Sequence, residues 1–290
     1  MPRTTRRGRR GRPALTVRAP VPVLACAVAL AAGGLAAGCS GGPSKVDHAG
    51  PAPSGATASA ARAGTAPQTT PTNQTPTLPD WLAGAVANQG VELDPSWDKT
   101  MTVITDSVVL GARSYLPARV RGWKVQFQGF PALTLPAANT ELRAANRPVG
   151  SVVVLALGYN SNWQRNRQMY DFFAKQFDEN ADRLIDTVKA LGVKKIVWVN
   201  LRHATLANSP NGPTTVKEVD EYSWYFPYVN ERLNELVKRH PDAALANWEA
   251  VSNRPSLTYD YIHLNPLGSN LMSEVIKASA GILNTPVPGL

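Results

Sequence analysis

Two continuous runs of β-branched and other apolar residues constrain the fold of this chain more than any other feature. They are residues 151–157, SVVVLAL, and residues 194–201, KKIVWVNL. A strand that is apolar at nearly every position is buried on both faces, which is typical of a parallel sheet covered by helices. Weaker runs predict further strands at residues 101–104, 123–127 and 243–248. We therefore expect an α/β fold: a three-layer α/β/α sandwich with a mainly parallel, five-stranded sheet.

Helical periodicity fills the intervals between these runs. Apolar spacing of three and four residues predicts helices over residues 165–190, 229–237 and 271–276. In the first helix, the stripe formed by Phe172, Phe173 and Phe177 is expected to face the core. In the second, Pro227 is expected in the first turn, where a proline is tolerated.

The basic character of the chain is confined to its N-terminus. The formal net charge is +9, from 30 basic and 21 acidic residues. Seven of the arginines lie within residues 1–38, a segment without acidic residues. The rest of the chain therefore contains 23 basic and 21 acidic residues. The rest of the chain is close to neutral, and no nucleic-acid partner is expected.

The N-terminus has the layout of a targeting segment. Arginines come first, an apolar run covers residues 21–32, and small residues lead to Cys39. The ending LAAGC resembles a bacterial lipoprotein signal, although Ala36 stands where leucine is more usual. The resemblance implies a signal peptide at 1–38, lipidation of Cys39 and a membrane anchor at the outer face of the cell. Ordinary secretion, an uncleaved anchor and twin-arginine export are the alternatives.

Composition divides the rest of the chain. Residues 39–77 are rich in Ala, Pro and Thr and predict a disordered tether, because such a segment cannot bury enough apolar surface to fold. Residues 78–100 are expected to pack as an extension on a domain that covers 101–290. The only cysteines are Cys26 and Cys39, so the domain has no disulfide or thiolate metal site. Its histidines show no metal-ligand spacing, and no cofactor or metal is expected.

Polar residues follow several predicted strands at the positions where parallel α/β sheets bind ligands. Ser107 comes after the first strand, and the sequence YDYIHLNPLGS places Asp260 and His263 before the last helix. A serine needs a base to accept its proton, and an imidazole titrates near neutrality. A carboxylate three residues upstream can hold that imidazole in the required tautomer. We therefore predict a nucleophile, base and orienting acid in Ser107, His263 and Asp260.

The same edge offers donors for the oxyanion of an acyl-transfer intermediate. They are the backbone N–H groups of Ser107 and Gly129 and the side-chain amide of Asn160. Gly122 is the alternative to Gly129 for this role. For Asn160, the alternative is that it caps the next helix. Asp106 is expected to be structural, bonding loop amides beside the serine.

The order of these residues resembles the SGNH subgroup of the GDSL esterase and acyltransferase family. TDSVVLG stands for the first block, QG at Gly129 for the second, GYN at Asn160 for the third, and DYIHLNPLG for the last. Thr105 departs from the family pattern, which has glycine there. The resemblance covers about residues 101–283 and implies a flavodoxin-like fold and a serine acyl-enzyme. The sequence has no G-x-S-x-G motif, which argues against a nucleophile of the α/β-hydrolase type.

Aromatic residues near these positions are candidates for a substrate pocket. They are Tyr159, Trp163 and Tyr261, with His203 as a pocket wall; core packing is the alternative for the aromatics. With the export signal, the expected substrate is an acylated carbohydrate or glycolipid of the cell envelope. Esterase and O-acyltransferase activity share these residues. The rival functions are a non-catalytic envelope-binding module and a lysophospholipase-like lipid esterase.

Overall fold

The computed structural model describes residues 80–145, 148–161, 167–205, 208 and 216–282. The predicted signal peptide and tether therefore lie outside the described residues. Within them, no helix combines the length and the apolar character that crossing a membrane would require.

A six-stranded sheet forms the centre of the domain, in the order β1-β6-β5-β4-β2-β3. Its strands are β1 (Val86–Asn88), β2 (Thr100–Thr105), β3 (Lys124–Gly129), β4 (Val152–Ala156), β5 (Lys195–Val199) and β6 (Ala243–Ala246). The strands β2 to β6 are parallel and match the five predicted runs, which confirms the α/β prediction. All residues of β4 and β5 are buried, as their apolar character requires.

The additional strand comes from the segment before the predicted domain. β1 pairs antiparallel with β6, and the side chain of Lys195 reaches the adjoining segment. Its Nζ donates to the carbonyl of Gln89 at 2.6 Å and to that of Val91. Residues 86–91 are thus built into the sheet edge.

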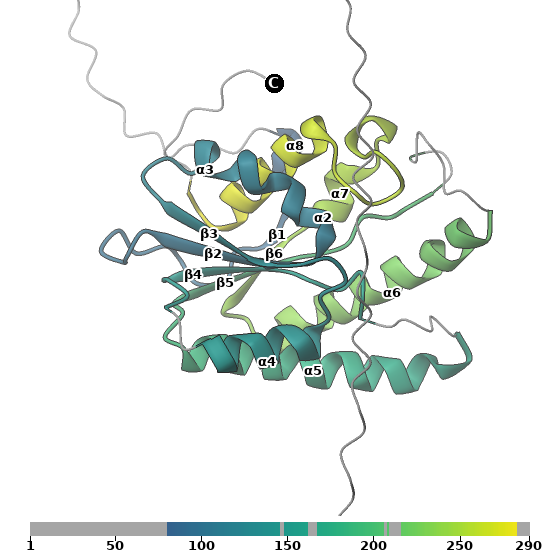
Figure 1. Cartoon of the computed structure of the whole chain (residues 1–290), viewed down its shortest axis with the longest axis horizontal. Helices are drawn as coiled ribbons and strands as arrows, with labels where there is room; N and C mark the ends of the chain where they lie inside the picture. The colour runs from purple at the N-terminus through teal and green to yellow at the C-terminus, as the bar shows by residue number, and fades with distance from the viewer. Residues whose placement is uncertain (1–79, 146–147, 162–166, 206–207, 209–215, 283–290) are drawn as a thin grey trace, which may run out of the picture. The chain divides into compact units, whose positions relative to one another are not determined.

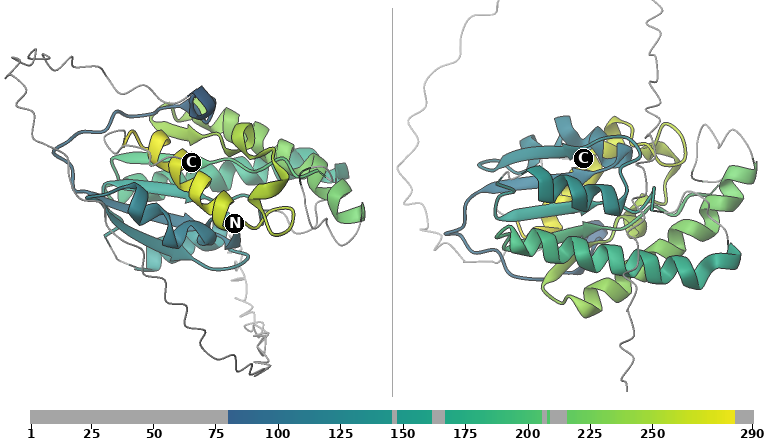
Figure 2. Two further views of the ribbon diagram at one scale, coloured as in Figure 1. Left: turned by 90° about the horizontal axis from the view of Figure 1, so that it is seen from above. Right: turned by 60° about the horizontal axis from the view of Figure 1, so that its bottom comes forward.

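Helices cover both faces of the sheet, so that the domain has three layers (Figure 1). One layer contains α2 (Ser107–Leu110), α3 (Leu116–Arg119), α7 (Trp248–Ser252) and α8 (Pro266–Ser279). The other contains α4 (Leu135–Ala145), α5 (Tyr170–Ala190) and α6 (Val216–Arg239). The short helix α1 (Asp80–Ala83) precedes β1, and 3₁₀ turns cover Gly111–Ser114, Arg167–Met169 and Pro255–Leu257. Seen from above in Figure 2, α8 crosses over the strands, and nearly all of its residues are buried.

Two helix predictions were wrong in detail. Pro227 lies inside α6 and not in its first turn, because the helix begins at Val216. The stripe of α5 is only partly in the core: Phe177 is buried, whereas Phe172 is 57% exposed. The first turns of α5 therefore present an aromatic ring to solvent, and only the later turns carry a fully buried stripe.

Candidate active site

Ser107 is the first residue of α2, and Asp106 alone separates it from Thr105, the last residue of β2. Asp106 caps this helix: its carboxylate accepts a hydrogen bond from the N–H of Val108 at 3.0 Å. The buried strand and the capped turn together fix the backbone at Ser107, at the carboxyl edge of the sheet.

Three predicted catalytic side chains form a continuous hydrogen-bonded chain. The Oγ of Ser107 lies 3.0 Å from Nε2 of His263, and Nδ1 of His263 lies 2.7 Å from Oδ2 of Asp260. The side chains of His263 and Asp260 are 43% and 37% exposed, so water and a substrate can reach them. A serine, an imidazole and a carboxylate in this order can activate the serine hydroxyl.

Hydrogen bonds in the turn around Asp260 determine the protonation states of Asp260 and His263. Burial alone would raise the pKa of Asp260, but hydrogen bonds from the His263 ring and from the N–H groups of His263 and Ile262 lower it to about 2. The bond to Asp260 in turn raises the pKa of His263 above its usual 6.5. Asp260 therefore remains a carboxylate at neutral pH and stabilises a proton on the imidazole.

Gly129 lies at the last position of β3, paired in register with Thr105. A Cβ atom there would come within 1.9 Å of the Thr105 carbonyl oxygen, so only glycine fits. Gly122 precedes β3, at the opposite edge of the sheet, with a φ of 83° that suits a turn. Of the two candidate glycines, Gly129 is therefore the one on the same edge as Ser107.

Asn160 follows β4 and joins the same edge. Its Nδ2 donates to Oδ2 of Asp106 at 3.0 Å. An amide nitrogen has two N–H groups, so this bond orients the side chain and leaves a second donor. Asp106 is fully buried, and burial raises its pKa to about 7 despite the bonds from Val108 and Asn160. Its contacts are with the helix N-terminus and an amide, as expected for a structural residue.

The predicted pocket residues separate into different environments. Tyr159 is only 5% exposed; its ring packs edge-on against Phe226 and its hydroxyl accepts from the N–H of Arg202. Of the two roles predicted for Tyr159, pocket lining and core packing, its burial supports core packing. Tyr261 and His203 are partly buried near the edge, and Trp163 lies outside the described residues.

Arg202 is a residue that the sequence analysis did not identify. It follows β5 and is completely buried. Its guanidinium donates to five oxygens: the carbonyls of Ser252, Arg254, Tyr261 and Asn208 and the hydroxyl of Thr258. These are all five of its N–H groups. Arg202 thus holds the segment that leads into Asp260 and His263. An arginine directly after an apolar strand was the available signal, but the prediction considered His203 there instead.

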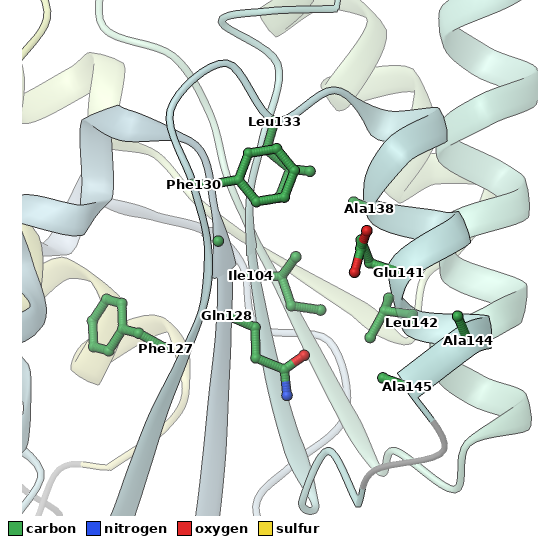
Figure 3. A pocket seen from close by; sticks show the side chains of 11 residues that line it. Ile104, Phe127, Gln128, Phe130, Leu133, Ala138, Glu141, Leu142, Ala144 and Ala145 are labelled. Atoms are coloured by element: carbon green, nitrogen blue, oxygen red, sulfur yellow. The ribbon is translucent and has the colours of Figure 1, made fainter. Parts of the chain in front are cut away.

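A groove of about 440 Å³ lies between β3 and α4 and includes Gly129 in its wall (Figure 3). Ile104, Leu133 and Leu142 point into it, and the carboxylate of Glu141 faces the same space. The lining is mostly apolar, so the groove can accept an apolar group. Among the described residues, no group of His, Cys, Asp and Glu side chains could hold a metal ion.

Known proteins resemble this chain in structure but not detectably in sequence. No family model matches it, and neither does any curated protein. A protein described as a GDSL-like lipase from Parabacteroides merdae is 12% identical, with a TM-score of 0.51, over 66% of this chain and 100% of its own.

Two other solved structures align over a similar part of the chain. A gut microbial diltiazem-metabolizing enzyme is 16% identical, with a TM-score of 0.51, over 67% of this chain and 49% of its own. The C-terminal catalytic domain of a Streptococcus pneumoniae peptidoglycan O-acetyltransferase aligns at 18% identity and a TM-score of 0.46, over 65% and 96%. The alignments with a TM-score of 0.51 show that the domain shares the fold of the Parabacteroides merdae GDSL-like lipase and of the diltiazem-metabolizing enzyme.

Proposed function

We propose that this protein is an SGNH-type serine esterase or O-acyltransferase. Its substrates would be ester-linked acyl groups on carbohydrate or glycolipid of the cell envelope. The observation that carries the proposal is the contact chain from Ser107 through His263 to Asp260, at the carboxyl edge of a parallel sheet. The matching fold supports it.

In the first half of the reaction, the Oγ of Ser107 attacks the ester carbonyl carbon while its proton passes to Nε2 of His263. The carbonyl oxygen becomes an oxyanion, which would accept hydrogen bonds from the N–H groups of Ser107 and Gly129 and from Nδ2 of Asn160. Losing one such donor typically costs about 100- to 1000-fold in rate. The intermediate then expels the alcohol, which takes the proton from Nε2, and leaves an acyl group on Ser107.

In the second half, a hydroxyl attacks the acyl-enzyme and gives its proton to His263. Water as the attacking group releases a carboxylic acid, whereas a sugar hydroxyl produces a new ester. His263 then returns a proton to the departing Oγ of Ser107. The ionised Asp260 stabilises the imidazolium in both halves, because its carboxylate bonds the opposite ring nitrogen.

The proposed location follows from the N-terminal sequence. The arginines, the apolar run and Cys39 support an exported lipoprotein, held at the outer face of the membrane by residues 39–77. Mass spectrometry of the mature N-terminus tests this. An unmodified Cys39 would rule out the lipid anchor.

The catalytic proposal is tested by p-nitrophenyl acetate turnover and by labelling with a fluorophosphonate probe. We expect the Ser107→Ala variant to lose both. Ser256→Ala removes a serine from an exposed position in the segment before Asp260 and serves as the matched control. Equal labelling of wild type and Ser107→Ala would refute the nucleophile. It would favour a non-catalytic binding module, against which the 3.0 Å contact with His263 argues.

A lipid esterase is the second candidate, and the apolar groove beside Gly129 favours it. A panel of p-nitrophenyl esters from acetyl to dodecanoyl separates the two functions. Preference for acetyl supports carbohydrate deacylation or acetyl transfer. Preference for long chains supports the lipid esterase. In that case Leu142→Trp, which fills the groove, should reduce turnover of long chains more than that of acetate.

A further inference from the structure

A second pocket lies at the opposite edge of the sheet from Ser107. It has a volume of about 450 Å³, and its wall includes Trp97, Trp123, Lys99, Arg121 and Asp94. Lys99 and Trp123 directly precede the first residues of β2 and β3, whereas Ser107 follows the end of β2. At roughly 3.3 Å per residue, the six residues of β2 separate the two edges by about 20 Å. The pocket is therefore a site of its own.

Its polar groups have few partners within the protein. Among residues 80–145, 148–161, 167–205, 208 and 216–282, no ion pair or side-chain hydrogen bond involves Lys99 or Arg121. The same holds for the indole N–H groups of Trp97 and Trp123. Asp94 uses Oδ1 for the N–H and hydroxyl of Ser96, which leaves Oδ2 as an acceptor. These donors and this acceptor face solvent or a ligand.

We propose that this pocket binds a glycan chain that carries carboxylate groups. The faces of two indoles suit the apolar C–H faces of sugar rings, while their N–H groups can donate to hydroxyls. Asp94 can accept from a hydroxyl, and the two cations outnumber this single acid and can bond a carboxylate. A nucleic acid fits poorly, because the chain beyond residue 38 is close to neutral.

The site would hold the protein on an acidic envelope polymer while the opposite edge of the sheet remains open. The proposal also explains why the segment before β2 carries Trp97 at a position that is only partly buried. It stands independently of the catalytic proposal, because binding here needs neither Ser107 nor His263.

The test measures co-sedimentation of the full-length Ser107→Ala protein with insoluble peptidoglycan, whose glycan chains carry carboxylates on their attached peptides. Chitin, a neutral N-acetylated glycan, is the comparison. We expect Trp97→Ala and the double variant Lys99→Glu, Arg121→Glu each to raise the Kd for peptidoglycan about tenfold or more. Arg143→Glu changes an exposed cation elsewhere and should bind like the parent. The exposed charge changes carry little risk to folding, and circular dichroism checks each variant.

An unchanged Kd in both variants, or no binding by the parent, would overturn the proposal. Equal dependence of chitin and peptidoglycan binding on Lys99 and Arg121 would overturn the carboxylate part. The catalytic proposal fails by a different result, since p-nitrophenyl acetate turnover is measured in the wild-type background. There Trp97→Ala should leave turnover unchanged.

Discussion

Replacing Arg202 by methionine would remove the buried cation that holds the segment leading to His263. Methionine keeps an unbranched stem as far as the position of Nε but has no guanidinium and no N–H group. Five oxygens would lose their donor at once, and four of them are backbone carbonyls between residues 208 and 261. The turn with Asp260 and His263 directly follows these contacts, so we expect a loss of both stability and activity.

The size of each effect can be estimated from the contacts. A buried acceptor that loses its partner costs about 1–3 kcal/mol. Two effects reduce the total. Some of the five oxygens can bind water instead, and the variant no longer has to bury a charged guanidinium. We therefore expect the free energy of unfolding to fall by about 3–5 kcal/mol, within the range of severe single substitutions. A displacement of about 1 Å at His263 would lower kcat about 100-fold.

The assay combines urea unfolding with p-nitrophenyl acetate kinetics at a temperature where the variant remains folded. Arg254→Met is the matched control: it makes the same change on the same segment, at an exposed side chain whose carbonyl still accepts from Arg202. Arg202→Lys keeps the charge but cannot supply five N–H groups, so we expect an intermediate result. Added guanidinium should partly restore kcat in Arg202→Ala.

Two outcomes would refute this reasoning. Arg202→Met could match Arg254→Met in unfolding free energy, and the five contacts would then contribute nothing measurable. Alternatively, the variant could lose stability but keep the wild-type kcat while folded. In that case Arg202 would support the fold without positioning His263.

The remaining predictions concern pH. The bond to Asp260 raises the pKa of His263, so kcat/KM should fall as pH drops through a value above 6.5. Asp260→Asn should shift this fall of kcat/KM to lower pH and reduce kcat by about 10⁴-fold. If the fall stayed at the same pH, the contact between Asp260 and His263 would be contradicted. Burial raises the pKa of Asp106 from 3.8 to about 7, so the wild type should lose up to roughly 4 kcal/mol of unfolding free energy as pH rises between these values. Asp106→Asn has no titrating group at this position and should lack this loss. Urea unfolding of both proteins from pH 4 to 7.5 tests the prediction, and an equal change of unfolding free energy with pH in both would contradict it.

The sheet could be predicted because its strands carry local signals. Runs such as residues 151–157 are apolar at nearly every position, and burial on both faces leaves few alternatives. β1 has no such signal: it has three residues, and its partner β6 lies more than 150 residues later. The start of α6 was missed because Pro227 is usually a sign of a helix beginning, whereas here it lies within the helix.

In the candidate site, too, some residues carry a local sequence signal and others do not. Ser107, Asp260 and His263 follow predicted elements, so their meeting at one edge could be anticipated from chain order. Arg202 also follows a predicted strand, but its contacts could not be anticipated, because its partners are mostly backbone carbonyls about 50 residues away and carry no sequence pattern. The sequence left Tyr159 open between pocket and core, because a residue after a strand can turn either way, and the packing with Phe226 decides.

The pairing of β1 with β6 determines how the sheet is protected from other molecules. An unpaired strand edge offers free N–H and C=O groups to any extended chain and promotes aggregation. Three residues of β1 cover that edge, and Lys195 anchors the segment that follows them. Proteolysis within residues 86–91 would therefore do more than release the domain from the proposed anchor. It would expose the edge of β6 and remove the acceptors of a buried cation, so a released domain would remain soluble only if cleavage occurs before β1.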